Sequence, residues 1–149
     1  MKTSQNCHFL GLIFGVFCVC MLAGQTPASE SRTSTVLIRV HGAHSHRGVM
    51  RLVLYHDHAI YVERQAQIDE TSLSAVFVLD SLPQGNYSAY VYHDQNNNGK
   101  MDTNLFGIPT ERYGASNNPP KRAGRPSLEE TRFPVNDREI AIDIQLISW

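Results

Sequence analysis

The chain has 149 residues, enough for one domain, and its 13 lysines and arginines nearly balance its 14 acidic residues. This balance excludes the strongly basic surfaces through which proteins bind nucleic acids or membranes non-specifically. We therefore expect no nucleic-acid partner.

Residues 1–28 have the layout of a secretory signal peptide. Lys2 precedes an uncharged apolar run, Leu10–Gly24, and small residues leading up to Ala28 suit a cleavage site after that position. The run is shorter than the roughly 20 residues that a membrane span needs, which favours a cleaved signal peptide. The alternative interpretation is an uncleaved N-terminal membrane anchor. Residues 29–149 then form a single mature domain, which we expect to be periplasmic or secreted, monomeric and without a membrane span.

The cysteines of the chain all lie in this leader, at Cys7, Cys18 and Cys20. The mature domain therefore has no disulfide and must be held together by burial or by a bound metal ion. A bound ion would be its only cross-link.

Apolar residues alternate with polar ones in several short segments of the mature domain, which predicts β-strands. The strand segments are 34–41, 49–56, 74–79, 86–93 and 139–147. The first two are joined by a glycine-containing turn, which suggests a hairpin. Residues 57–71 are ambiguous between a helical turn and an edge strand, and residues 105–134, rich in glycine and proline, are predicted to form a long loop. This pattern predicts an all-β domain, an antiparallel β-sandwich, with an open barrel as the alternative.

The stretch after the fourth strand has the spacing of a calcium-binding loop. Side-chain oxygens recur at alternate positions from Asp94, Gly99 at position six allows a sharp turn, and a second acid, Asp102, stands at position nine. The carbonyl oxygen of Lys100 would add a backbone ligand. The candidate Ca²⁺ ligands are Asp94, Asn96, Asn98, Lys100, Asp102 and Glu111.

The match is incomplete at position twelve, where Leu105 stands in place of the bidentate glutamate of helix-loop-helix calcium sites. Glu111 would complete the ligand set if residues 106–109 fold back. We expect a moderate affinity for calcium, roughly 10⁻⁶ to 10⁻³ M. The alternative is a metal-free turn capped by its own asparagines, but a turn alone does not require acids at both positions one and nine.

Three other groups of side chains have both a functional and a structural interpretation. The first group is a histidine cluster, His41, His44 and His46, whose imidazoles would suit zinc or copper. No cysteine or paired carboxylate completes a metal site there, so we favour solvated histidines. Six tyrosines would stack on sugars or form core and cross-strand pairs: Tyr55, Tyr61, Tyr87, Tyr90, Tyr92 and Tyr113. Three basic residues would hold an anionic ligand or belong to a solvated loop: Lys121, Arg122 and Arg125.

The segment Tyr90–Asn118, YVYHDQNNNGKMDTNLFGIPTERYGASNN, resembles the signature of the DUF2141 family of small exported bacterial proteins of unknown function. Residues 48–55, 82–87 and 124–129 also fit this family. The resemblance implies a transthyretin-like or immunoglobulin-like β-sandwich in the periplasm or outside the cell, and it implies no established reaction. The loop is also similar to calcium loops in the sandwich repeats of bacterial surface adhesins, where position twelve is acidic.

Two functions from different classes fit these features. The first, which we favour, is a non-catalytic exported module that is stabilised by calcium and binds a protein or glycan of the cell envelope through its loops. The second is a small hydrolase or transferase built on His93, Asp94 and Glu111, although no nucleophile motif accompanies these residues.

Overall fold

The computed structural model describes residues 32–121 and 124–149, which form two β-sheets without an α-helix. The predicted signal peptide, residues 1–28, lies outside the described residues. The strands are β1 (Thr33–His41), β2 (Val49–His56), β3 (Ala59–Ala66), β4 (Ser74–Pro83), β5 (Gly85–Asp94), β6 (Tyr113–Ala115), β7 (Arg132–Val135) and β8 (Glu139–Gln145). In this part of the chain no helix is long and apolar enough to cross a membrane.

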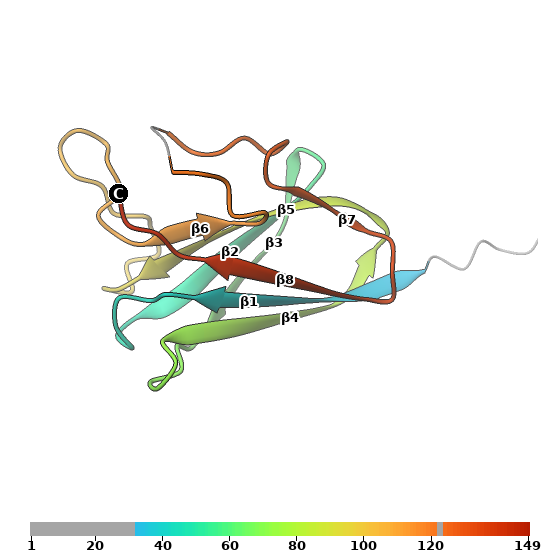
Figure 1. Cartoon of the computed structure of the whole chain (residues 1–149), viewed down its shortest axis with the longest axis horizontal. Helices are drawn as coiled ribbons and strands as arrows, with labels where there is room; N and C mark the ends of the chain where they lie inside the picture. The colour runs from blue at the N-terminus through green and yellow to red at the C-terminus, as the bar shows by residue number, and fades with distance from the viewer. Residues whose placement is uncertain (1–31, 122–123) are drawn as a thin grey trace, which may run out of the picture.

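The strands are divided between a three-stranded sheet, β4-β1-β8, and a larger sheet, β3-β2-β5-β6, in which β7 also pairs with β5. Figure 1 shows the two sheets lying one over the other. The predicted all-β sandwich is confirmed. All neighbouring strands are antiparallel except β1 and β8, which run parallel because the chain crosses over from β7 in the larger sheet to reach β8.

The core lies between the two sheets and is built from the inward side of each alternating strand. Val36, Ile38 and Val40 of β1 have no exposed surface. From the larger sheet, Leu52 and Leu54 face them with at most 1% of their surface exposed. Burying each such side chain contributes about 1.5–3 kcal/mol, so these stripes hold the sheets together without disulfides.

The predicted hairpin between the first two strands is wrong, because β1 and β2 belong to different sheets. Their connection, residues 42–48, crosses from one sheet to the other and is held by His93 of β5. Nδ1 of His93 accepts a hydrogen bond from the backbone N–H of His44 at 3.2 Å, which places the ring proton on Nε2. Nε2 then donates to the carbonyl oxygen of Arg47 at 2.7 Å. A short glycine-containing connection is compatible with a hairpin or a crossover, and here the side chain of a distant strand supports the crossover.

Two further segments contain strands that the alternation did not predict with certainty. The ambiguous residues 57–71 include β3, a mostly exposed edge strand that pairs with β2. The predicted long loop, residues 105–134, includes the short strands β6 and β7, which both pair with β5. Strands of three and four residues are too short to show a period of two.

We expect Gly48→Ala to destabilise the domain more than Gly107→Ala does. Both glycines have positive φ angles, +78° and +75°, so either substitution introduces backbone strain of about 1 kcal/mol. A Cβ atom at Gly48 would also collide with the carbonyl oxygen of Asp94, whereas nothing lies within 4 Å of a Cβ at Gly107. Urea denaturation should show losses of about 3 and about 1 kcal/mol respectively. Equal losses would contradict the close approach of the two backbones.

Candidate functional site

The last two residues of β5 point to opposite sides of the larger sheet, and both are fully buried. His93 faces inward to the crossover, and Asp94 faces outward to the loop that follows. Arg51 lies on the neighbouring strand β2, and its Nε is 2.5 Å from Oδ2 of Asp94. Because an isolated buried carboxylate is strongly unfavourable, this guanidinium is a necessary partner of Asp94.

Asp94 also closes the first turn of the loop. Its Oδ1 accepts a hydrogen bond from the backbone N–H of Asn98 at 3.0 Å, and its Oδ2 accepts one from Gly99 at 2.9 Å. Gly99 has a φ of +79°, a conformation that glycine adopts without strain. One carboxylate therefore binds both the neighbouring strand and the turn.

The rest of the loop is closed by hydrogen bonds between carboxylate and amide groups. The two oxygens of Asp102 accept hydrogen bonds from Nδ2 of Asn96 at 2.7 Å and Nδ2 of Asn98 at 2.8 Å. The Oδ1 atom of Asn96 accepts from the N–H of Asn98 at 3.1 Å, and the Oδ1 atom of Asn98 accepts from the N–H of Lys100 at 2.8 Å. The predicted ligand residues are thus gathered in one network.

Glu111 returns to this loop, because an isolated β-bridge folds the intervening segment back. Its two carboxylate oxygens accept hydrogen bonds from the N–H groups of Gln95, at 2.9 Å, and Asp102, at 3.1 Å. Leu105, at position twelve, is fully exposed at the tip of the segment. Glu111 therefore joins the beginning and the end of the loop through backbone groups.

The loop offers carboxylate and amide oxygens, which are the type of ligand that calcium prefers. The described residues contain no group of three His, Cys, Asp or Glu side chains placed to hold a metal ion. The carboxylates of Asp94, Asp102 and Glu111 therefore do not form such a group by themselves, and asparagine amides would have to complete the site. The Oδ1 atoms of Asn96 and Asn98 and both oxygens of Asp102 each accept one hydrogen bond, which leaves a lone pair on each for a hard cation. Asp94 differs, because it already faces the cation of Arg51.

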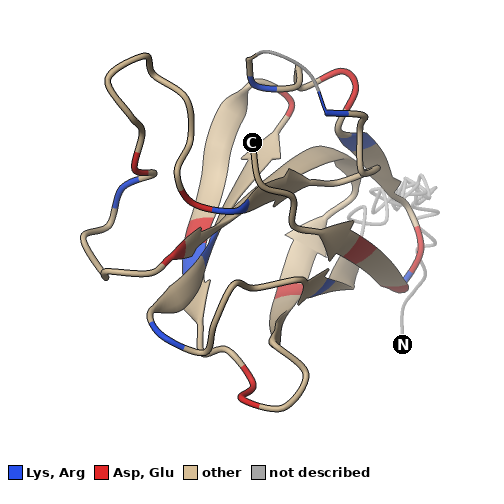
Figure 2. Ribbon diagram, turned by 60° about the vertical axis from the view of Figure 1, so that its left-hand side comes forward, with Lys and Arg blue, Asp and Glu red and all other residues tan. Residues whose placement is uncertain are grey.

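The electrostatics of the loop are local to the pair of Asp94 and Arg51. Burial by itself raises the pKa of Asp94, but hydrogen bonds from Arg51 and from the N–H groups of Gly99 and Asn98 outweigh it and hold the pKa below its usual value. The same hydrogen bond raises the pKa of Arg51. Figure 2 shows acidic and basic residues distributed around the whole of the described ribbon, so this pair is not part of a charged face.

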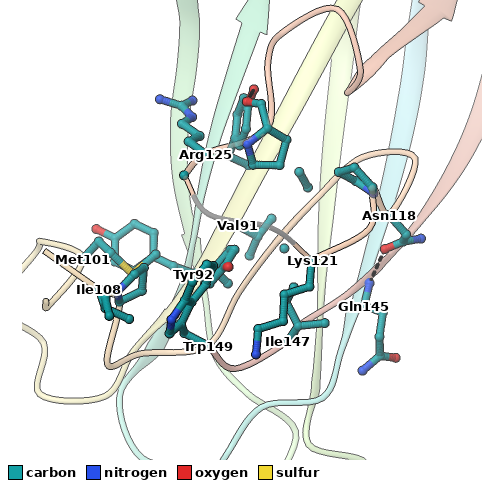
Figure 3. Close-up of a pocket in the computed structure, with 18 of the residues that line it drawn as sticks. Val91, Tyr92, Met101, Ile108, Asn118, Lys121, Arg125, Gln145, Ile147 and Trp149 are labelled. Atoms are coloured by element: carbon teal, nitrogen blue, oxygen red, sulfur yellow. Dashed lines mark hydrogen bonds between the residues drawn. The ribbon is translucent and has the colours of Figure 1, made fainter. Parts of the chain in front are cut away.

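A cleft of about 730 Å³ lies on the outer side of the larger sheet, beside the loop. We call it the tyrosine cleft because four of the six tyrosines line it: Tyr55, Tyr90, Tyr92 and Tyr113. Figure 3 shows Met101 and Ile108 on one side of it, Asn118 on another, and Ile147 and Trp149 of the chain end at its lower edge. The volume lies in the range of small-molecule sites.

Hydrogen bonds to the larger sheet fix the walls of the tyrosine cleft. The hydroxyl of Tyr90 donates to the carbonyl oxygen of Pro126 at 2.8 Å, and the hydroxyl of Ser88 donates to that of Leu128 at 2.8 Å. Tyr113 and Ile147 exchange two backbone hydrogen bonds of 3.0 and 2.8 Å, which hold the chain end against β6. The loop closed by Asp94 and Glu111 supplies the remaining wall.

A family model described as "Uncharacterized protein conserved in bacteria (DUF2141)" matches residues 38–143, which include the Asp94 loop and most of the tyrosine cleft. The chain belongs to this family. The resemblance seen in the sequence is thereby confirmed. No curated protein and no solved structure gives a significant match.

The other candidate residues of this DUF2141 domain occupy structural positions. His93, Asp94 and Glu111 do not line the tyrosine cleft. The three histidines form no metal cluster; His41 lies 3.7 Å from Asp143, and His44 and His46 are exposed. Tyr87 is a core residue that is 1% exposed, and Tyr61 packs against it. Arg122 of the basic cluster lies outside the described residues.

Sequence reasoning missed Arg51 and the tyrosine cleft. Arg51 lies on the side of β2 opposite to the core, where its side chain is 29% exposed. The signal that would identify its role is the pairing of β2 with β5, because Arg51 then stands opposite Tyr92 and next to Asp94. That pairing cannot be inferred from either strand alone.

We expect Asp94→Asn to destabilise the domain by about 2 kcal/mol at neutral pH, because it removes the charge that faces Arg51. The folded-state pKa of Asp94 is lowered, so its contribution is complete above the unfolded-state pKa and is lost as the pH falls through the folded-state value. The difference in free energy of unfolding between the wild type and the variant should therefore shrink as the pH falls below the unfolded-state pKa of about 3.9, as measured by urea denaturation.

Asp102→Asn is the matched control, since Asp102 is half-exposed and bonded only within the loop. It should cost less than about 1 kcal/mol. A loss for Asp94→Asn that is the same at every pH would show that the ionised carboxylate does not stabilise the fold.

Proposed function

We propose that this DUF2141 domain is an exported, non-catalytic binding module whose ligand occupies the tyrosine cleft. The observation that carries this proposal is the convergence of four tyrosines, Trp149 and two apolar walls on one concave surface. Concave sites of this size, lined mainly by aromatic and apolar groups with a few polar ones, are typical of ligand-binding proteins. Export is supported by the signal-peptide pattern of residues 1–28.

A binding role is favoured over a hydrolase or transferase because the candidate catalytic groups have other bonds. His93 bonds backbone groups of the crossover, Asp94 bonds Arg51 and the turn, and Glu111 bonds two N–H groups of the loop. A general base needs an accessible position within hydrogen-bond reach of a substrate proton. The positions of these three residues support a structural role instead.

The lining of the tyrosine cleft favours a partner that presents an apolar group. The ring of Tyr90 is covered by Arg125, which lies 3.7 Å from the ring centroid, whereas Lys121 lies further from the ring of Trp149, at 5.3 Å. Tyr92, Tyr113 and Trp149 are therefore the rings that offer most surface for contact. Phe106, 87% exposed, adds an apolar side chain at the loop tip. A protein or glycan of the envelope would contact the module at these rings, and an apolar portion of either would be bound most strongly.

Titration of the isotope-labelled domain with a library of small apolar and aromatic compounds tests this proposal by NMR. Compounds that bind should shift the amide signals of Tyr92, Ile147 and Trp149. Trp149→Ala should weaken the affinity of such a compound by about tenfold, because it removes an aromatic contact. Ile60→Ala, which truncates an exposed apolar residue of β3 away from the cleft, should leave the affinity unchanged. Shifts confined to other surfaces, or no binding at all, would contradict the proposal.

We further propose that the loop binds Ca²⁺ as a structural cross-link. The spacing of the oxygens and their gathering into one network support this, with ligands from Asp94, Asn96, Asn98, Lys100, Asp102 and Glu111. The ion would compete with Arg51 for Asp94, so we expect an affinity at the weak end of the range for calcium loops, roughly 10⁻⁴ to 10⁻³ M.

Calcium at about 10 mM should raise the midpoint of thermal unfolding by a few degrees relative to chelator. Magnesium at the same concentration should raise it less, because Mg²⁺ requires a stricter geometry. Asp94→Ala should abolish the increase. An unchanged midpoint together with no calorimetric heat of binding would leave the metal-free turn as the correct interpretation, without affecting the proposal for the tyrosine cleft.

A further inference from the structure

We infer that the ligand of the tyrosine cleft is an amphiphilic organic anion, a small molecule with an apolar body and one terminal carboxylate, sulfate or phosphate. This inference rests on the proposed binding function and specifies the chemistry of the ligand. Two basic residues of the cleft, Lys121 and Arg125, carry it.

The charged side chains that line the tyrosine cleft are all positive. Lys121 and Arg125 belong to its lining, which contains no aspartate or glutamate. Among residues 32–121 and 124–149, neither cation forms an ion pair with an acidic side chain. A mainly apolar cleft with unpaired cations is complementary to a ligand that is apolar along most of its length and negative at one end.

Both cations are held over aromatic rings, which positions them without neutralising them. Nζ of Lys121 is 5.3 Å from the ring centroid of Trp149. The guanidinium of Arg125 is 3.7 Å from the centroid of Tyr90 and 5.1 Å from that of Tyr55. A guanidinium stacked on a ring keeps its N–H groups free at the edge, in the geometry that binds a carboxylate or phosphate with two hydrogen bonds.

The two cations lie at different ends of the tyrosine cleft. Figure 3 shows Arg125 at the top of the view and the side chain of Lys121 lower down, beside Ile147 and Trp149, with Val91 between the two cations. An anionic head group at either cation would therefore leave the rest of the ligand on the apolar surface between them. The volume of about 730 Å³ suits one such molecule.

The polar side chains of the cleft argue against a fully polar ligand such as a sugar. Oδ1 of Asn118 accepts a hydrogen bond from the backbone N–H of Gln145 at 2.8 Å, and Nδ2 of Asn118 donates to the carbonyl oxygen of Asp143 at 2.9 Å. The hydroxyl of Tyr90 is bonded to Pro126. Since these groups already have protein partners, they are not available to the hydroxyls of a sugar, which favours a ligand with an apolar body.

The chain has one tryptophan, Trp149, so its fluorescence reports directly on the tyrosine cleft. The full mature domain should be titrated with decanoate, decanol and decylamine, each below its micelle concentration, while the emission of Trp149 is followed. These probes share their alkyl chain and differ in the charge of the head group. Decanoate should bind about tenfold more tightly than decanol, because its carboxylate gains about one charge-assisted hydrogen bond. Decylamine should bind most weakly, because its head group is positive like the cations of the cleft.

Variants identify the residues that recognise the charge. Arg125→Gln and Lys121→Gln, combined in one chain, should lower the affinity for decanoate about tenfold more than the affinity for decanol, so that the advantage of decanoate disappears. Lys100→Gln, an exposed lysine that does not line the cleft, is the matched control and should bind decanoate as the wild type does. Urea denaturation of the variants establishes that each is folded.

The outcomes distinguish this inference from the proposed function. Equal affinities for all three probes would overturn the anionic specificity but leave the tyrosine cleft as a ligand site. No change in the emission of Trp149 or in the amide signals of the cleft would overturn both. Binding of an acidic peptide at the cleft without binding of decanoate would replace the small anion with a protein segment and overturn the inference.

Discussion

A buried carboxylate at the end of β5 is the constraint on which the loop and the tyrosine cleft both depend. Asp94 has no exposed surface, and a buried charge without partners costs several kcal/mol. Arg51 and the N–H groups of Asn98 and Gly99 must therefore meet it, which fixes the start of the loop against β2. Glu111 then joins both ends of the loop, and the segment between them becomes a wall of the cleft.

The alternation of side chains along β5 extends this constraint to the opposite side of the sheet. His93 and Asp94 are neighbours in sequence, yet one holds the crossover between the sheets and the other holds the outer loop. A shift of one residue in the register of β5 would exchange these two positions and lose both sets of contacts. Ser88 and Tyr90 on the same strand bind the opposite wall of the cleft, so β5 positions two of its walls, while β6 holds the chain end.

Features that depend on near neighbours in sequence were predicted correctly, and features that depend on distant pairing were not. The inward stripe of Val36, Ile38 and Val40 follows from alternation alone. In contrast, Arg51 meets Asp94 from 43 positions away. The predicted hairpin was wrong for the same reason, since a local turn pattern does not specify the sheet to which the next strand belongs. The tyrosine cleft combines side chains from four separate parts of the chain, and each of them, taken alone, is an ordinary strand or loop residue.

The bonding of the loop also determines how strongly an ion there would affect the cleft. Met101 and Ile108 belong to the segment that the loop holds in place, so an ion that tightened the loop would strengthen ligand binding, and the ligand would strengthen ion binding by the same factor. Such coupling requires that the loop be loose without the ion. Arg51 already supplies a cation to Asp94, and the asparagines, Asp102 and Glu111 already bond one another or the backbone. The wall is therefore ordered by the protein itself, and calcium would add stability to the domain more than affinity to the cleft.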